Sequence, residues 1–321
     1  NAIWPRLIAI RLLPAAIRRY LSLRFFEYYP NLHIAQRIPA MSDLQLIEQF
    51  NRDGYIAIPN AFNSDEVAKM QREADAMLEL IINSSIAHSR RSGRLSIVES
   101  EQGEQVAVKI QPVNDLSLYL AAISADERLI GPMRTLMADE PILMEEKLNY
   151  KQPLSEPVSG FDISGRRSDG WGMHSDWAYY KAQDYPQTII SSAICLDDCT
   201  AENGPLHIWP GTHKEHLPHQ RSEHGGLVVE PGSIDSAGGN DLLVPAGTIL
   251  LFSSLLIHNS RPNTSGNPRR LMIYSHYPQT ADMGIDVRNG PSRLREAPYE
   301  WEYIRMRERG EAQVVFNAPT H

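Results

Sequence analysis

A long apolar segment in the C-terminal half, LLVPAGTILLFSSLLIHNS (residues 242–260), is the best guide to the fold. It starts with a turn signal, continues as a β-like run and ends at a histidine before a polar loop. Similar short runs occur at 187–198 (QTIISSAICLDD), 203–211 (NGPLHIWPG) and 269–278 (RRLMIYSHYP). Many short strands with Gly/Pro turns between them are typical of a sandwich or barrel. The sequence therefore predicts a mainly β protein.

The N-terminal part of the chain predicts helices that flank this β region. Residues 42–54 begin at a potential cap, Ser42, and end at a glycine, as a short helix should. Residues 55–59 alternate like a strand. Asn63 and Glu66 then form a capping-box pattern that opens a second helix. Helical spacing predicts a buried face on it, made of Val67, Met70, Ala74, Met77 and Ile81.

The middle of the chain gives weaker signals. Residues 106–113 and 145–153 resemble strands, and residues 116–124 and 128–138 resemble helices. Residues 153–172 are rich in Gly, Pro and Ser, which predicts a loop.

Net charge and its distribution narrow the class of protein. The 321 residues carry a formal charge of −8, which argues against general nucleic-acid binding because such binding needs a basic surface. Residues 1–40 are different, with six arginines and a single acid, Glu27. We interpret residues 1–40 as a basic helical arm and residues 41–321 as one β-rich domain. Within residues 6–26 of this arm, the longest uncharged stretch between arginines, residues 12–17, is far too short to span a bilayer.

Two roles for the arm stay open, namely packing on the protein body and a peripheral membrane contact through residues 1–30. The expected location is the cytoplasm, either free or at a membrane surface, although arginine-rich termini also occur in organelle-targeting peptides. The two cysteines, Cys195 and Cys199, are too few for a disulfide framework. We interpret them as reduced thiols near a core, which favours a reducing compartment.

The segment WGMHSDWAYY (171–180) holds a histidine and an aspartate two positions apart. Side chains at i and i+2 of a strand point to the same side, so His174 and Asp176 could bind one metal ion. His258 is the favoured third ligand, because it ends the long apolar run where a barrel would have its mouth. The other candidates are His207, His213, His216, His219, His224 and His276.

Two histidines and a carboxylate on one face leave three positions of an octahedral ion open, as in non-haem Fe(II) oxygenases. Zinc could also bind such a set. Arg269 follows His258 by 11 residues. In a jelly roll it would lie on the strand next to the His258 strand, where an inward guanidinium could bind a carboxylate cosubstrate. A register shift would turn Arg270 inward instead, and a surface salt bridge is the alternative for either.

Taken together and in order, these motifs resemble the phytanoyl-CoA dioxygenase family of Fe(II)/2-oxoglutarate-dependent oxygenases, which includes ectoine hydroxylases. The resemblance covers most of residues 43–280. Besides the HSD pair, it includes the segments IEQFNRDGYIAIPNAFNSDEV (47–67), ENGPLHIWPGTHK (202–214) and PAGTILLFSSLLIHNSRPNTSGNPRR (245–270). It implies a double-stranded β-helix, the cupin-like jelly-roll barrel, with an N-terminal helical layer.

The resemblance also implies roles for individual residues. Iron binding falls on His174, Asp176 and His258. The positions implied for binding 2-oxoglutarate are Arg269, Ser260, Ser191 and Asn149. His213 is implied to be structural, and His207 stands where related sequences often have arginine.

The implied reaction uses Fe(II), 2-oxoglutarate and O2 to hydroxylate an unactivated C–H bond, with release of succinate and CO2. The substrate is expected to be a small molecule or an amphiphile such as a lipid or glycolipid. Aromatic residues after the metal motif, Trp177, Tyr179 and Tyr180, could line its pocket or belong to the core. Two other functions stay open: a non-redox zinc enzyme on a cupin-like barrel, and a binding barrel without catalysis.

Overall fold

The computed structural model describes residues 42–100, 103–163, 168–223, 226–285 and 298–318. The basic arm expected at residues 1–40 lies outside them, so its packing or membrane role stays a prediction. Among the described residues, no helix is long and apolar enough to cross a membrane.

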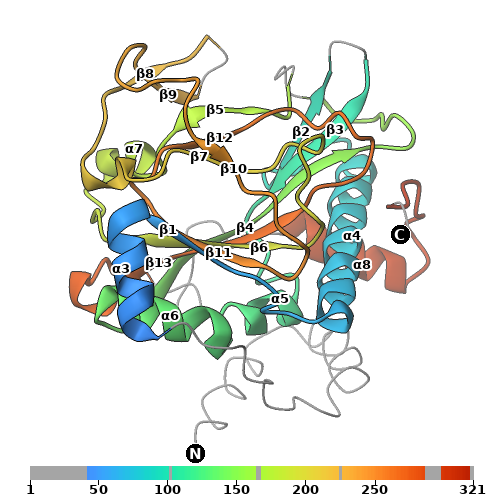
Figure 1. Cartoon of the computed structure of the whole chain (residues 1–321). Helices are drawn as coiled ribbons and strands as arrows, with labels where there is room; N and C mark the ends of the chain where they lie inside the picture. Colours follow the sequence, from blue (N-terminus) through green and yellow to red (C-terminus); the bar gives the residue numbers. More distant parts are fainter. Residues whose placement is uncertain (1–41, 101–102, 164–167, 224–225, 286–297, 319–321) are drawn as a thin grey trace, which may run out of the picture.

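The strands form two antiparallel sheets and one separate pair (Figure 1). Those of the larger sheet are β1 (Tyr55–Ile58), β2 (Leu95–Glu99), β3 (Gln105–Ile110), β4 (Pro141–Pro153), β6 (Ile190–Cys195), β11 (Ile249–Ser253) and β13 (Leu271–Pro278). Those of the smaller sheet are β5 (Trp171–His174), β7 (His207–Ile208), β10 (Asn240–Asp241) and β12 (His258–Ser260). The separate pair is β8 (His219–Arg221) and β9 (Leu227–Val229).

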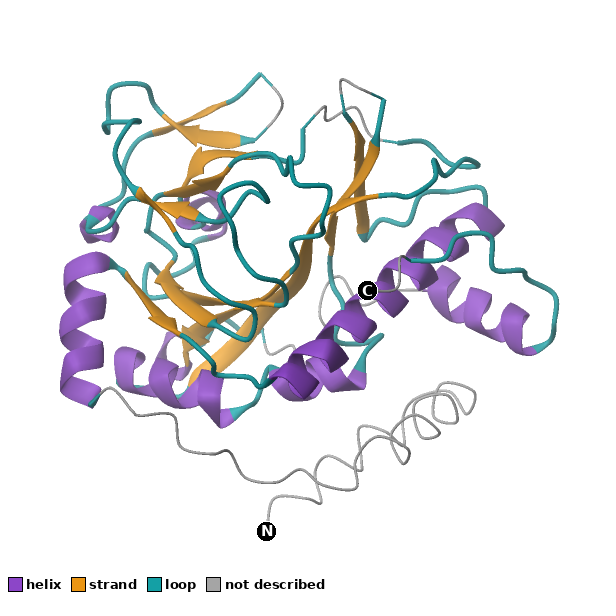
Figure 2. Cartoon of the chain, turned by 45° about the vertical axis from the view of Figure 1, so that its right-hand side comes forward, coloured by secondary structure: helices purple, strands orange, loops and turns teal. Residues whose placement is uncertain are grey.

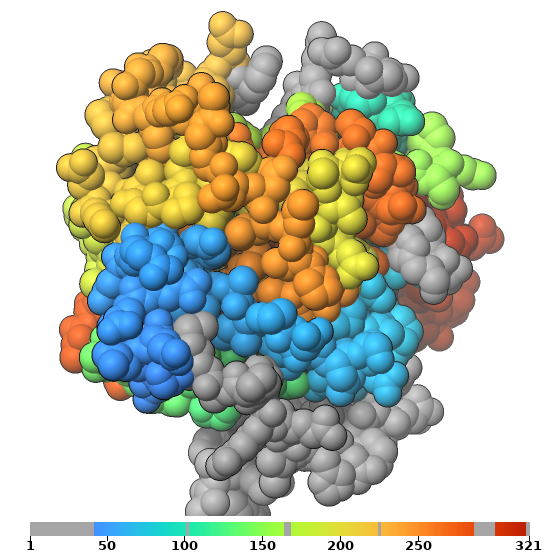
Figure 3. Space-filling model, in the orientation of Figure 1, coloured from blue at the N-terminus to red at the C-terminus, as the bar shows by residue number. Residues whose placement is uncertain are grey.

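The larger sheet has the order β1-β11-β6-β13-β4-β3-β2 and the smaller one β10-β7-β12-β5. Neighbours in these orders are mostly far apart in sequence, which is how a chain that crosses repeatedly between two sheets builds a jelly roll. The expected jelly-roll architecture is confirmed. In Figure 3 the yellow and orange segments between β6 and β13 cover the upper left and the centre of the face shown.

The helices lie largely along one side of the strands (Figure 2). They are α3 (Asp43–Asp53), α4 (Ser64–Ala87), α5 (Leu118–Ile123), α6 (Glu127–Met137), α7 (Trp177–Tyr180) and α8 (Pro298–Glu308). Local sequence explains the first two. Ser42 caps α3 and Gly54 ends it in the left-handed conformation, whereas Asn63 and Glu66 form the predicted capping box of α4.

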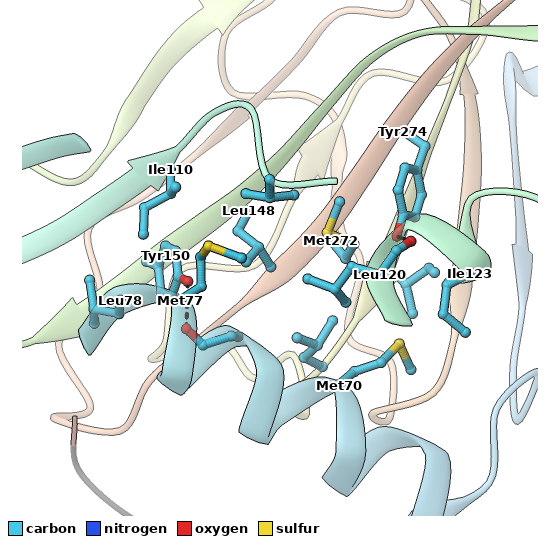
Figure 4. Packing of buried hydrophobic residues seen from close by; sticks show 14 of the residues in the cluster. Met70, Met77, Leu78, Ile110, Leu120, Ile123, Leu148, Tyr150, Met272 and Tyr274 are labelled. Carbon is cyan, nitrogen blue, oxygen red and sulfur yellow. Dashed lines mark hydrogen bonds between the residues drawn. The ribbon is translucent and has the colours of Figure 1, made fainter. Parts of the chain in front are cut away.

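The main core lies between α4 and the larger sheet. The predicted apolar face of α4 is buried, and Figure 4 shows Met70 and Met77 on the side of this helix that faces Leu148 and Met272 of the sheet. The hydroxyl of Tyr150 donates to the carbonyl of Ala74 in α4 at 2.8 Å, which satisfies a polar group in this apolar layer.

Alternation along the strands gives the larger sheet a second buried face. Met272 and Tyr274 of β13 belong to the core under α4, whereas Leu271 and Ile273 belong to another cluster with Cys195 of β6. Because side chains alternate across a strand, odd-numbered residues of β13 point away from the helices and into the barrel. This face carries the functional side chains.

His213 has a packing role, as the resemblance implied. Gly54 has φ 81° at the end of α3, and a Cβ placed there would overlap with the imidazole ring of His213. Only glycine fits both the left-handed backbone and this close approach.

Candidate metal centre

His174 and His258 lie directly opposite each other in the antiparallel pair of β5 and β12. Their ring centroids are 4.5 Å apart, and each residue is 8% exposed. Strand pairing, and no local motif, brings these two imidazoles together.

Backbone carbonyls orient both rings. Nδ1 of His174 is 2.6 Å from the carbonyl oxygen of Gly172, and Nδ1 of His258 is 3.0 Å from that of Leu256. A carbonyl oxygen only accepts, so each Nδ1 carries the proton and each Nε2 presents a lone pair. Burial, and then the neighbouring His258, lowers the pKa of His174 to about 3, which keeps its ring neutral near pH 7.

Asp176 completes the cluster from a different element than expected. The strand β5 ends at His174, and Asp176 has helical backbone angles as the residue preceding α7. The expectation that both residues point inward from one extended strand is therefore wrong, because the chain turns between them. Oδ1 of Asp176 nevertheless lies 3.9 Å from Nε2 of each histidine.

The charge of Asp176 is held by its surroundings. Burial by itself would raise the pKa of this carboxyl group, but Lys147, His258 and His174 outweigh it and the pKa is lowered. Its second oxygen, Oδ2, accepts a hydrogen bond from the Ser191 hydroxyl at 3.3 Å. The carboxylate therefore directs Oδ1 toward the two histidines and Oδ2 toward Ser191.

One ligand atom from each of His174, Asp176 and His258 lies within 4.8 Å of the other two, the only such group of three among the described residues. Two imidazoles and one carboxylate fit a divalent first-row metal ion. Three protein ligands leave further positions of the ion open for a cosubstrate and O2. Of the other candidate histidines, His224 lies outside the described residues, and the rest are not part of this group.

The two consecutive arginines have different partners. Arg270 is tied by ion pairs to Asp75 of α4 and to Asp197. Arg269 is 2% exposed, and its Nε donates to the carbonyl of Gly204 at 3.1 Å. Across the described part of the chain no carboxylate pairs with Arg269, whose burial lowers its pKa. A buried guanidinium without an anion fits an anionic ligand.

The strand that follows Arg269 is not the neighbour of the His258 strand. β12 belongs to the smaller sheet and β13 to the larger one, so that expectation is wrong. The polar loop after β12 carries the chain across from one sheet to the other. Arg269 continues the pairing of β13 with β4, since its backbone exchanges hydrogen bonds with Lys151.

The other three residues implied to bind 2-oxoglutarate differ in their positions and their hydrogen-bond partners. Asn149 of β4 lies opposite Leu271, and its Oδ1 is buried with no hydrogen-bond partner in the described segments, as expected of a group that awaits a ligand. Ser260 is buried on β12, two residues after His258. Ser191 contacts Asp176 instead, as described above.

Sequence reasoning missed a polar cluster on the barrel side of β4. Oε1 of Glu145 accepts from Lys147 Nζ at 2.9 Å and from the Tyr180 hydroxyl at 2.7 Å, and lies 3.4 Å from the Ser275 hydroxyl. The signal was present, because every second residue from Glu145 to Lys151 is polar, and such alternation marks one face of a strand.

Two of the aromatic residues after the metal motif are bound to their surroundings. The Trp177 indole N–H donates to the carbonyl of Tyr185, and the Tyr180 hydroxyl donates to Glu145. His207 of β7 is held by the neighbouring strand β10, with Nδ1 2.6 Å from Asp241. Nε2 of His219 accepts from the backbone N–H of Ser175 at 3.1 Å, which supports the turn between His174 and Asp176.

Comparison with known proteins gives three informative relatives. An ectoine dioxygenase of Stutzerimonas stutzeri (strain A1501) is 28% identical over 248 residues, which cover 72% of this chain and 75% of that protein. A probable alpha-ketoglutarate-dependent hypophosphite dioxygenase of Stutzerimonas stutzeri is 25% identical over 233 residues, which cover 70% and 74%. The crystal structure of EctD from S. alaskensis with bound Fe has a TM-score of 0.57 and 25% identity, and the match covers 84% of this chain and 92% of that one.

The jelly-roll fold and the site of two histidines and one aspartate define the class, an iron- and 2-oxoglutarate-dependent dioxygenase. Residues 50–271 match the family described as Phytanoyl-CoA dioxygenase (PhyH). The chain belongs to this family.

Proposed function

We propose that the protein hydroxylates an unactivated C–H bond of a small polar molecule, with 2-oxoglutarate and O2 as cosubstrates and succinate and CO2 as coproducts. The observation that carries the proposal is the combination of the His174, Asp176 and His258 cluster with the buried Arg269, which pairs with no carboxylate in the described part of the chain. A zinc hydrolase would use the cluster but would have no need of the arginine.

The cluster residues would hold Fe(II) through Nε2 of His174, Nε2 of His258 and Oδ1 of Asp176. When bound, the iron supplies O2 activation coupled to oxidative decarboxylation of 2-oxoglutarate. Arg269 would bind the distal carboxylate of the cosubstrate with the planar fork of its guanidinium. The remaining contribution of the chain is to position the reactants and to exclude water.

The substrate class follows from the wall opposite the smaller sheet. Glu145, Lys147 and Tyr180 give this part of the barrel charged and hydroxyl groups, which an acyl chain would cut off from water while offering them no further hydrogen bond. A substrate with several hydrogen-bonding groups suits this wall better than a lipid tail. A lipid or glycolipid with a polar headgroup in the barrel is the second candidate, supported by the basic residues 1–40.

The proposal is tested by anaerobic titration of the metal-free protein with Fe(II) and 2-oxoglutarate. We expect a visible metal-to-ligand charge-transfer band in the wild type and in His207→Ala, whose ring bonds elsewhere, and none in His174→Ala. No band in the folded wild type would contradict the proposal.

The substrate is then sought by measuring succinate release with a panel of amino-acid derivatives, small polar metabolites and glycolipids. A zinc enzyme would behave differently. Its activity would survive Arg269→Ala, and it would form no succinate from 2-oxoglutarate.

A further inference from the structure

Two buried serine hydroxyls lie side by side on neighbouring strands of the larger sheet. Ser191 of β6 and Ser275 of β13 are register partners, and their Oγ atoms are 2.9 Å apart. Both residues are 0% exposed. Their neighbours along β6 and β13 on this face, Ala193 and Ile273, are apolar. Hydroxyl groups in such a place need hydrogen-bond partners, and the partners show what the pair does.

Each end of the pair reaches a carboxylate. Ser191 Oγ is 3.3 Å from Oδ2 of Asp176, and Ser275 Oγ is 3.4 Å from Oε1 of Glu145. The two hydroxyls therefore connect the carboxylate of the metal cluster with the ion pair between Glu145 and Lys147.

Counting protons decides the direction of these contacts. Two hydroxyls own two protons, but there are three contacts, so only two contacts can be hydrogen bonds at one time. Glu145 has Lys147 and Tyr180 as donors to the same oxygen. Oδ2 of Asp176 has Ser191 as its only donor among the described residues. The arrangement that leaves no acceptor without a donor runs from Ser275 to Ser191 to Asp176.

We propose that Ser191 and Ser275 form a hydroxyl bridge that fixes Asp176, so that Oδ2 is held by Ser191 and only Oδ1 faces the two histidines. In this arrangement Ser191 is a positioning residue for a metal ligand, and Ser275 acts through Ser191. The inference rests on the metal site of the proposed function. It differs from the role that the resemblance implied for Ser191, which was contact with 2-oxoglutarate.

The bridge has a chemical purpose. A carboxylate that is free to rotate can offer both oxygens to a metal ion, and the second oxygen would take a position that the cosubstrate or O2 needs. A hydrogen bond to one oxygen removes that option and keeps the ligand in one orientation, as partners of metal ligands commonly do.

The test measures metal affinity without the cosubstrate. Calorimetry of the metal-free full chain with Co(II), in the absence of 2-oxoglutarate, gives the affinity of the three-residue cluster alone. We expect Ser191→Ala to weaken Co(II) binding by about tenfold, the lower end of the usual effect of such partners. Ser191→Thr keeps a hydroxyl and should restore most of the affinity. Ser275→Ala should show a smaller loss, and the double variant should bind no worse than Ser191→Ala.

Ser192→Ala is the matched control. Ser192 is the next residue of β6 and is equally buried, but its hydroxyl donates to the carbonyl of Tyr274 and not to the cluster. Its loss should leave Co(II) affinity unchanged. The wavelengths of the Co(II) absorption bands should shift in Ser191→Ala and stay constant in Ser192→Ala.

The second measurement separates the two roles of Ser191. With the metal saturated, the affinity for 2-oxoglutarate should change little in Ser191→Ala. A large loss of 2-oxoglutarate affinity with unchanged Co(II) affinity would show that Ser191 binds the cosubstrate. That result would overturn the hydroxyl-bridge proposal but leave the proposed function standing. If the wild type bound no Co(II), the proposed function itself would fall. Where Ser191→Ala does not fold, Ser275→Ala and Ser191→Thr decide between the same outcomes.

Discussion

Arg269 and Arg270 are adjacent in the chain, yet among the residues that the structure describes Arg269 is buried without a carboxylate partner and Arg270 is held by two. Asp75 and Asp197 neutralise Arg270 on the helix side of the larger sheet. Arg269 has the carbonyl of Gly204 as its partner on the barrel side. Because side chains alternate along a strand, Arg270 lies among structural ion pairs, whereas Arg269 lies on the face where a ligand can bind.

The two arginines should respond differently to removal. Arg270→Ala leaves two nearly buried carboxylates without their cation and should lower the free energy of unfolding by about 3–5 kcal/mol. Arg269→Ala removes a buried charge that has no counter-ion, so the stability of the ligand-free protein should hold or rise. Its 2-oxoglutarate affinity should fall roughly 10- to 100-fold. Urea denaturation measures the stability and calorimetry the 2-oxoglutarate affinity. A stability loss in Arg269→Ala together with an affinity loss in Arg270→Ala would mean that Arg270 binds the cosubstrate and Arg269 is structural.

The ion pair of Glu145 and Lys147 should be strongly coupled. Lys147→Met leaves Glu145 with hydroxyl and amide donors only, and Glu145→Gln leaves the ammonium of Lys147 without its carboxylate. Each single change should cost about 3 kcal/mol of unfolding free energy. In the double variant about 1–3 kcal/mol of this loss should be recovered. Additive losses in the denaturation experiments would mean that the two side chains act independently.

Metal binding should stabilise the fold through the cluster. A metal ion that binds only the folded chain at 100 times its dissociation constant adds about 2.7 kcal/mol to the free energy of unfolding. We expect Co(II) to raise the thermal midpoint of the wild type and of the control His207→Ala, and a chelator to reverse the effect. His258→Ala should show no increase; an increase of wild-type size there would place the metal elsewhere.

Part of the pH dependence of stability in the metal-free protein should come from His219. Burial lowers its pKa, and the ring of His216 stacks on it with centroids 5.2 Å apart. The unfolded chain therefore binds protons more readily than the folded one. Stability is full above the usual histidine pKa, about 6.5, and decreases as the pH falls below it. Because this ring is only half-buried, the effect should be below about 1 kcal/mol.

His219→Gln provides the check on this pH dependence. Its amide oxygen can still accept from the backbone N–H of Ser175, but it does not titrate. Urea denaturation between about pH 5.5 and 7.5 should show a flatter pH dependence in the variant than in the wild type. An unchanged slope would show that the pH dependence has another origin.

Several features of the fold follow from short-range sequence signals. The capping box formed by Asn63 and Glu66 marks the start of α4, and helical spacing correctly predicts its buried face. Short apolar runs with Gly/Pro turns predict the β-rich half. These signals act between residues a few positions apart, so they are present in the sequence whatever the rest of the chain does.

The sequence by itself determined the class of protein. It contains, in order, the HSD motif, His258 and the arginine pair, and these are the residue types that can hold a metal ion and a carboxylate. Only the tertiary structure decided that Asp176 sits in a turn, that Arg269 lacks the carboxylates that Arg270 has, and that Ser191 contacts Asp176. The physical reason is that these contacts depend on the register of strands distant in sequence. A shift by one residue would exchange the faces of every side chain without changing any local pattern.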